Sequence, residues 1–149
     1  MSESSEFYPM PGFATFAVRD LGVSCVFYES LGFRTVFVMP GPGGKPQLAH
    51  LRWARYADLL LKAETAPEAR PKGLGLTVSF AVSDGALEGL TERARSLGAK
   101  FVHEPGDRPW NARDFTLADP DGFALTFAMG PLNRDLALDQ VVANAARAS

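Results

Sequence analysis

The chain has 149 residues, of which 46% are hydrophobic and 21% are charged, a composition typical of a single folded domain. Its net charge of −2 argues against nucleic acid or an anionic membrane surface as the main partner. The single cysteine, Cys25, excludes an internal disulfide, and no stretch reaches the roughly 20 apolar residues that span a bilayer. Since the start of the chain also lacks the pattern of a signal peptide, we expect a cytoplasmic protein.

An internal repeat organises the sequence. Residues 16–20 read FAVRD and residues 80–84 read FAVSD, and each is followed by a helical pattern that ends in Leu-Gly. Asp20 and Asp84 are therefore expected to cap the starts of two helices. The strands expected in chain order lie at residues 13–19, 36–38, 48–53, 57–62, 77–83, 101–102, 113–118 and 123–128.

The repeat predicts an α+β fold made of two tandem βαβββ modules. We expect a single domain over residues 1–149, with module one at about 12–64 and module two at about 74–130. The strands are expected to form a curved mixed sheet around a cavity. A C-terminal extension, residues 131–149, carries apolar side chains at helical spacing, which predicts an amphipathic helix over residues 133–147. This helix could pack on its own subunit, cap the cavity or extend a dimer contact.

Side chains alternate in size along the predicted strands. Because successive residues point to opposite faces, large side chains such as Phe16, Phe80 and Phe127 should pack together against the helices. The opposite face carries Phe13, Thr15, Ala17, Thr77, Ser79, Ala81, Ala124, Thr126 and Ala128. Such a face either meets solvent or encloses a cavity. A cavity is favoured, since alanine and phenylalanine suit a wet surface poorly.

Three features together carry a resemblance to a known family. The chain has paired modules with V-x-D before each helix, the sequence FYESLGF at residues 27–33, and the turn DPDG at residues 119–122. Over about residues 12–130 this resembles the vicinal oxygen chelate superfamily, which contains glyoxalase I, extradiol dioxygenases and bleomycin resistance proteins.

The resemblance also implies where a catalytic member would hold its divalent metal ion. Those positions are Phe13, Thr77 and Thr126 in this sequence, with a fourth at Leu60 or Leu61. Phenylalanine and leucine cannot bind a metal, and threonine hydroxyls alone are poor ligands. We therefore expect no metal, no other cofactor and no catalytic residue. The alternative is a glyoxalase- or dioxygenase-like enzyme, a lyase or isomerase of the same superfamily, acting on a small molecule.

Residues 108–115 resemble the P-W-G-x-R-x-F stretch of the bleomycin resistance proteins, with Asn111 in place of the glycine. This implies a homodimer that binds a small aromatic or apolar molecule without metal and sequesters an antibiotic or other secondary metabolite. The partners expected are therefore a small-molecule ligand and a second copy of the chain, with no nucleic acid and no membrane.

Trp110 would supply a rigid stacking plane in such a site. The full set expected to line the site is Trp110, Phe13, Phe37, His50, Trp53, Tyr56, Thr77, Asp114 and Thr126. Alternation allows only one of Arg113 and Asp114 to face inward, and Phe37 could equally pack under the helices. His103 is expected at the surface.

Overall fold

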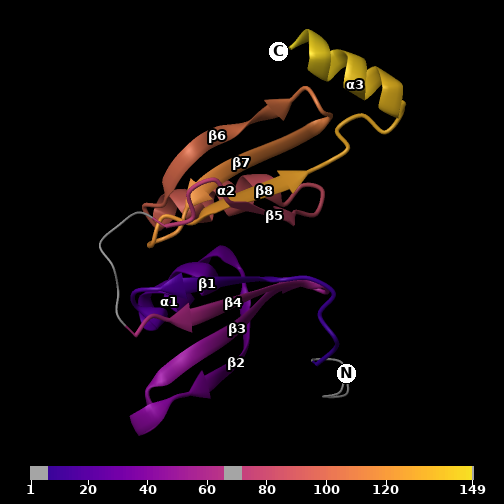
Figure 1. The fold of residues 1–149 in the computed structure, drawn as a ribbon. Coiled ribbons are helices and arrows are strands. Elements are labelled where there is room, and N and C mark those ends of the chain that lie inside the picture. Colours follow the sequence, from indigo (N-terminus) through magenta and orange to yellow (C-terminus); the bar gives the residue numbers. More distant parts are fainter. Residues whose placement is uncertain (1–6, 66–71, 149) are drawn as a thin grey trace. The chain divides into compact units, whose positions relative to one another are not determined.

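The computed structural model describes residues 7–65 and 72–148. Contacts divide the chain into two compact units, which consist of Met1–Leu74 with Asp119–Phe123, and of Gly75–Ala118 with Ala124–Ser149. Each unit holds one four-stranded sheet, and Figure 1 traces the chain through both. The predicted α+β class with two βαβββ modules and a C-terminal helix is confirmed. The strands form two separate mixed sheets, one for each module.

The first sheet has the strand order β1-β4-β3-β2. Strand β1 pairs with β4 in parallel, and the other pairs are antiparallel. In chain order the elements are β1 (Ala14–Val18), α1 (Leu21–Leu31), β2 (Arg34–Pro40), the short 3-10 helix η2 (Pro42–Gly44), β3 (Pro46–Ala54) and β4 (Ala57–Ala63).

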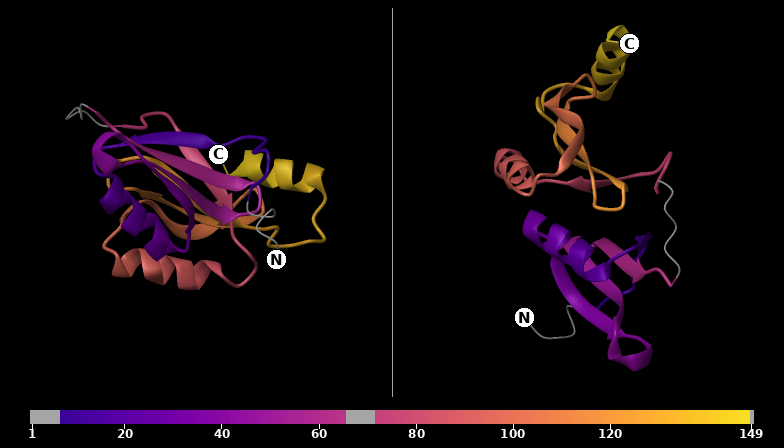
Figure 2. Two further views of the ribbon diagram at one scale, coloured as in Figure 1. Left: turned by 90° about the horizontal axis from the view of Figure 1, so that it is seen from below. Right: turned by 90° about the vertical axis from the view of Figure 1, so that its left-hand side faces the viewer.

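The second sheet repeats this topology with the order β5-β8-β7-β6. Figure 2 shows α2 along one side of this sheet, with α3 apart from α2. The elements are β5 (Thr77–Ala81), α2 (Leu87–Ser96), β6 (Lys100–Arg108), β7 (Ala112–Ala118), β8 (Ala124–Met129) and α3 (Leu138–Arg147). None of the helices in the described part of the chain has the length and apolar character needed to cross a membrane.

The two module helices begin differently, although the sequence places an aspartate before each. Asp20 caps α1 as predicted, because its Oδ1 accepts the Val23 backbone N–H at 3.0 Å. The same prediction for Asp84 is wrong. Gly85 adopts a left-handed φ of 81° and the chain turns once more, so α2 begins only at Leu87.

The predicted division of the strand faces agrees with the burial of the side chains. Phe16, Phe80 and Phe127 are all buried in their units, on the face against the helices. Phe13 stays 49% exposed and Thr77 is exposed as well, so neither belongs to a helix-packed core. The bulky and small faces of the strands are therefore separated as the alternation indicated.

The C-terminal helix is shorter than predicted. It begins at Leu138 rather than at residue 133, and the backbone N–H of Ala137 donates to the Gln140 side chain at 3.1 Å. The five residues before it form an irregular connection that contains a turn at Arg134 and Asp135. Asn133 accepts the Asp135 backbone N–H on its side-chain oxygen at 3.0 Å, which favours a turn at this point over a helix.

The turn between β7 and β8 belongs to the first unit, where Asp119 is its central polar residue. The Tyr28 hydroxyl donates to Asp119 Oδ2 at 2.7 Å. The backbone N–H groups of Asp121 and Phe123 donate to Oδ1 at 2.9 and 2.8 Å. Burial raises the pKa of Asp119 above its usual range, although these three hydrogen bonds oppose that shift.

The rest of the turn adds both polar and apolar contacts. Asp121 accepts the backbone N–H of Arg19 at 2.9 Å and pairs with its guanidinium at 3.2 Å. The Phe123 ring stacks on Phe16 with centroids 4.1 Å apart and planes within 1°. The DPDG motif is thus a structural part of the first unit, with its carboxylates held by hydrogen bonds.

We predict that Asp119→Ala lowers the free energy of unfolding by about 3 kcal/mol, because it leaves the Tyr28 hydroxyl and two backbone donors without their acceptor. Asp119→Asn retains an acceptor for the two backbone donors and should cost less. Urea denaturation measures both. Asp135→Ala, at an exposed position, is the control. Equal stability of Asp119→Ala and the control would contradict the role given to this carboxylate.

Candidate ligand-binding site

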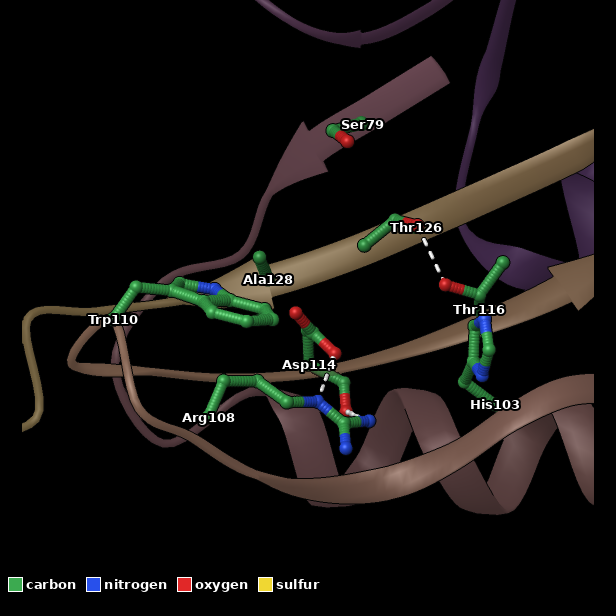
Figure 3. Close-up of a pocket in the computed structure, with 8 residues that line it drawn as sticks. All are labelled: Ser79, His103, Arg108, Trp110, Asp114, Thr116, Thr126 and Ala128. Atoms are coloured by element: carbon green, nitrogen blue, oxygen red, sulfur yellow. Dashed lines mark hydrogen bonds and ion pairs between the residues drawn. The ribbon is translucent and has the colours of Figure 1, made fainter. Parts of the chain in front are cut away.

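A pocket of about 450 Å³ opens on the second sheet, on the face opposite the buried phenylalanines. It draws residues from all four strands of this sheet and from the loop between β6 and β7. The pocket is lined by Ser79, His103, Arg108, Trp110, Asp114, Thr116, Thr126 and Ala128 (Figure 3).

The alternation of side chains along the strands creates this pocket. Phe115 and Phe127 are fully buried on the helix side of the sheet. Their neighbours must therefore point the other way, which directs Asp114 and Thr116 of β7 into the pocket. Thr116 lies opposite Thr126 of β8 in the antiparallel register, and their hydroxyl oxygens are 2.6 Å apart. Small side chains thus form the floor and leave the space above it open.

A partly buried ion pair sets the polarity of one wall. Arg108 donates from Nε to Asp114 Oδ1 at 2.7 Å, and its Nη2 donates to the backbone oxygens of Glu104 and Asp114 at 2.8 and 3.2 Å. Asp114 is only 7% exposed. Within the described part of the chain no hydrogen bond reaches its second oxygen, Oδ2. The pocket therefore offers a fixed carboxylate oxygen to a hydrogen-bond donor.

Trp110 provides the apolar part of the pocket. Its side chain is 55% exposed, an unusually large share for a tryptophan in a folded domain. Figure 3 shows the indole beside Ala128, with Asp114 on the same side of the sheet. A flat molecule that covered the indole would bury apolar area and could reach the Asp114 carboxylate.

Three of the residues predicted to line a ligand site come together here, namely Trp110, Asp114 and Thr126. Of the two alternatives on β7, Asp114 faces the pocket. Arg113 instead pairs with Asp107 at 3.0 Å and with Glu88 at 3.3 Å, and the hydrogen bond with Asp107 raises its pKa.

Sequence reasoning missed other parts of the pocket. His103 was expected at the surface. Although exposed, it lines the pocket, because β6 is irregular between Phe101 and Gly106 and brings it opposite Thr116. Arg108 was not selected at all. Its pairing with Asp114 depends on the β6–β7 register, and two opposite charges six residues apart around a Pro-Trp turn were the available signal.

Five of the predicted wall residues belong to the first unit and are not among the residues that line this pocket. Trp53 turns to the helix side, where its ring contacts Phe33 with centroids 5.0 Å apart. Tyr56 lies in the β3–β4 turn with a left-handed φ of 67° and packs against Tyr8. Phe13 precedes β1 and is half exposed. The remaining two, Phe37 and His50, contact each other edge to face at 5.4 Å.

Thr77 belongs to the second unit but is also not among the lining residues. It starts β5 opposite Ala124. It shares a face of the sheet with Ser79 but lies two residues earlier along the strand, whereas the pocket floor begins at the pair Ser79 and Thr126. The residue of β5 that lines the pocket is therefore Ser79 and not the predicted Thr77.

The open face of the first sheet holds a cluster of polar side chains and two aromatic residues from the N-terminal segment. Asp58 accepts from Arg52 Nε and from the Tyr8 hydroxyl, both at 2.6 Å, and lies 3.4 Å from His50 Nε2. The Arg52 guanidinium lies 4.3 Å from the centre of the Tyr8 ring. The Phe7 ring contacts Phe37 with centroids 6.3 Å apart. Side chains of this unit therefore occupy its sheet face.

The two registers allow the sheets to be compared position by position. The row Phe37, His50, Leu60 and Thr15 in the first sheet corresponds to His103, Thr116, Thr126 and Ser79 in the second. This correspondence selects Leu60 over Leu61, which is buried in the core. The first row contains Phe37, His50 and Leu60, and the second has the smaller set His103, Thr116 and Thr126 at the same positions. The smaller side chains leave the space that forms the pocket.

In residues 7–65 and 72–148 no three or more His, Cys, Asp or Glu side chains are grouped so that they could hold a metal ion. Cys25 lies half-buried in α1, where burial raises the pKa of its thiol.

The model of the glyoxalase/bleomycin resistance protein/dioxygenase superfamily matches residues 11–127. The chain belongs to this superfamily. None of the curated proteins compared with the sequence is similar enough to count as a relative. Solved structures of the superfamily fold are similar across most of the chain.

A glyoxalase/bleomycin resistance protein/dioxygenase domain from Frankia sp. EAN1pec has a TM-score of 0.68 at 23% identity, covering 87% of this chain and 96% of its own. TioX from Micromonospora sp. ML1 has a TM-score of 0.62 at 22% identity, with coverages of 80% and 94%. The fosfomycin resistance protein FosX from Mesorhizobium loti has a TM-score of 0.63 at 19% identity, with coverages of 88% and 100%. At these identities the likeness establishes the fold.

The cluster on the first sheet predicts a specific loss of stability in acid. Burial alone would raise the pKa of Asp58, but the hydrogen bonds from Tyr8 and Arg52 outweigh it and leave that pKa below its usual value. A lowered pKa in the folded state contributes stability above the unfolded-state pKa of about 3.9, and this contribution is lost as the pH falls through the folded-state pKa.

Asp58→Asn, which cannot ionise, should therefore be less stable than the wild type at pH 6, and the difference should shrink below about pH 4. Urea unfolding between pH 6 and pH 2.5 measures this difference. Asp135→Asn serves as the control for an exposed carboxylate. A stability difference that stays constant over the whole pH range would contradict the ionised pairing of Asp58.

Proposed function

We propose that the protein binds a small, largely aromatic molecule reversibly in the second-unit pocket and does so without a metal ion. Binding of this kind would sequester an antibiotic or other secondary metabolite and protect the cell that makes or meets it. The observation that carries the proposal is the half-exposed indole of Trp110 beside the buried carboxylate of Asp114, in a pocket of about 450 Å³.

The chemistry of the lining defines the ligand. A planar ring can stack on Trp110, which is held on a short loop and loses little conformational freedom when it is covered. A donor on the edge of that ring, such as an amino, amide N–H or hydroxyl group, can bond to Asp114 Oδ2. The threonine side chains of the floor are weakly polar, so an uncharged face of the ligand can lie against them. A dissociation constant below 1 μM needs more than about 8 kcal/mol, which burial of an aromatic plane with one charged hydrogen bond can supply.

Two further points support the proposal, and the first of them favours binding over metal catalysis. The positions at which the resemblance implies metal ligands hold Phe13, Thr77 and Thr126, and none of these side chains is an imidazole or a carboxylate. One protein of the same fold is named as a fosfomycin resistance protein, so drug resistance is a function found on this scaffold.

We further propose that the protein acts in the cytoplasm as a homodimer. The second copy would add walls to a pocket that its own unit leaves open, since Trp110 is covered on one side only. Light scattering distinguishes a dimer from a chain of 16.1 kDa. A monomer that binds ligand with full affinity would contradict this part of the proposal.

Fluorescence titration tests the binding proposal. Trp53→Phe removes the other tryptophan, which lies against Phe33 in the first unit, so that the remaining emission reports on Trp110 alone. Bleomycin, mitomycin C and a set of aromatic peptide antibiotics are titrated into this variant, and ligand is recovered for mass spectrometry. We expect saturable quenching by at least one ligand, which is recovered unaltered.

Calorimetry with the same ligand tests the contacts one by one. Trp110→Ala should weaken binding by about ten-fold or more, and Asp114→Asn by a similar factor if a donor reaches the carboxylate. Arg113→Gln, next to Asp114 but turned away from the pocket, is the matched control and should bind like the wild type. Ligand recovered with a changed mass would instead identify an enzyme. No saturable response from any ligand would overturn the proposal.

A further inference from the structure

The loop that carries Trp110 is fastened to the C-terminal extension by a pair of side-chain hydrogen bonds. Asn111 donates from Nδ2 to the backbone oxygen of Asn133 at 2.9 Å. Its Oδ1 accepts the backbone N–H of Asn133, also at 2.9 Å. The backbone oxygen of Asn111 accepts the Leu132 N–H at 3.0 Å. One carboxamide and its own backbone therefore hold two consecutive residues of the extension.

The backbone of Asn111 explains why an asparagine fits this position. Its φ is +66°, in the left-handed region where asparagine is the side-chain-bearing residue best tolerated after glycine. Glycine would satisfy the backbone equally well but could not make either bond to Asn133. Asparagine is thus suited to both demands, the turn after Trp110 and the contact with the extension.

An ion pair joins the extension to another loop of the same unit. Arg134 pairs with Asp84 at 2.9 Å, in the loop between β5 and α2. These contacts belong to residues 132–134, beyond residue 127, where the match to the superfamily model ends. The helix that follows leaves Leu138 and Val142 exposed and adds no buried side chain to its unit. Three hydrogen bonds thus join the extension to the residue after Trp110, and one ion pair joins it to the loop between β5 and α2.

We propose that Asn111 is a positioning residue for the ligand site and that the extension, through Asn133, holds the Trp110 indole in its binding orientation. This rests on the proposed function, since it assumes that Trp110 stacks on the ligand. A stacking plane that is already fixed loses less entropy when the ligand binds, so the contact contributes to affinity without touching the ligand. The extension is then part of the binding site.

The two hydrogen bonds are exposed to solvent, which separates this role from simple stability. Exposed hydrogen bonds exchange readily with water and contribute little to the free energy of unfolding. Their loss should change the freedom of the loop more than the melting temperature. A test of the proposal must therefore measure the motion of Trp110 itself.

The variant Asn111→Gly keeps the left-handed backbone and removes the carboxamide. It is made in the Trp53→Phe background, and time-resolved fluorescence anisotropy and acrylamide quenching of Trp110 are recorded without ligand. We expect faster local motion and stronger quenching at a nearly unchanged melting temperature. Asn111→Asp, which keeps the acceptor and loses the donor, should lie between the two.

Asn144→Ala, in α3, is the control. It also loses one carboxamide, but that side chain accepts from Arg147 within the helix and takes no part in the contact between Asn111 and Asn133. It should leave the motion of Trp110 unchanged. Unchanged anisotropy in Asn111→Gly, or an equal effect of Asn144→Ala, would overturn the positioning role.

The binding readout uses proflavine, a planar aromatic cation with amino donors, and calorimetry. We expect Asn111→Gly to weaken proflavine binding by about five-fold in the wild-type background and to have no effect in Trp110→Ala, because it acts through the indole. An equal loss in both backgrounds would overturn the proposal. If the wild type does not bind proflavine, the proposed ligand chemistry fails, whereas the ligand-free anisotropy still decides the role of Asn111.

Discussion

The alternation of side chains along β7 and β8 is the constraint on which both the core and the pocket of the second unit depend. Each strand contributes every second residue to one face, so the phenylalanines that fill the helix side commit the residues between them to the other side. Phe115 and Phe127 are fully buried, and Asp114, Thr116 and Thr126 consequently share the pocket. The core cannot shift by one residue without turning the pocket side chains inward, where a buried, unpaired carboxylate would be costly.

The two modules share one strand order but differ in the side chains that cover the sheet face opposite the helices. In the first sheet, Leu60 and His50 occupy the row that Thr126 and Thr116 occupy in the second, and Tyr8 bonds to the buried Asp58. In the second sheet the side chains of the row are small, and Trp110, which lines the same pocket, lies on a loop with half of its surface exposed. One module therefore fills its sheet face with its own side chains, whereas the other leaves a pocket on that face.

The sequence predicted the parts of the structure that depend on local pattern. The repeat, the strand faces, the cap at Asp20 and the pocket side chains on single strands, such as Thr126, all follow from spacing and alternation. The prediction failed for residues whose position depends on how neighbouring strands pair. His103 reaches the pocket through irregular pairing of β6, and Arg108 through its partner across the hairpin. Trp53 was assigned to the wrong face, although its period-two relation to the buried Leu51 was visible.

If the small side chains of this row make the pocket in which the ligand binds, a larger side chain at Thr126 should abolish binding. Thr126→Leu copies Leu60 of the first sheet, and Thr126→Val removes the hydroxyl at nearly constant volume. Calorimetric titration of both variants with a ligand that binds the wild type is the measurement. We expect binding to weaken by more than about ten-fold in the leucine variant alone, with both variants folded. Wild-type affinity in Thr126→Leu would contradict it.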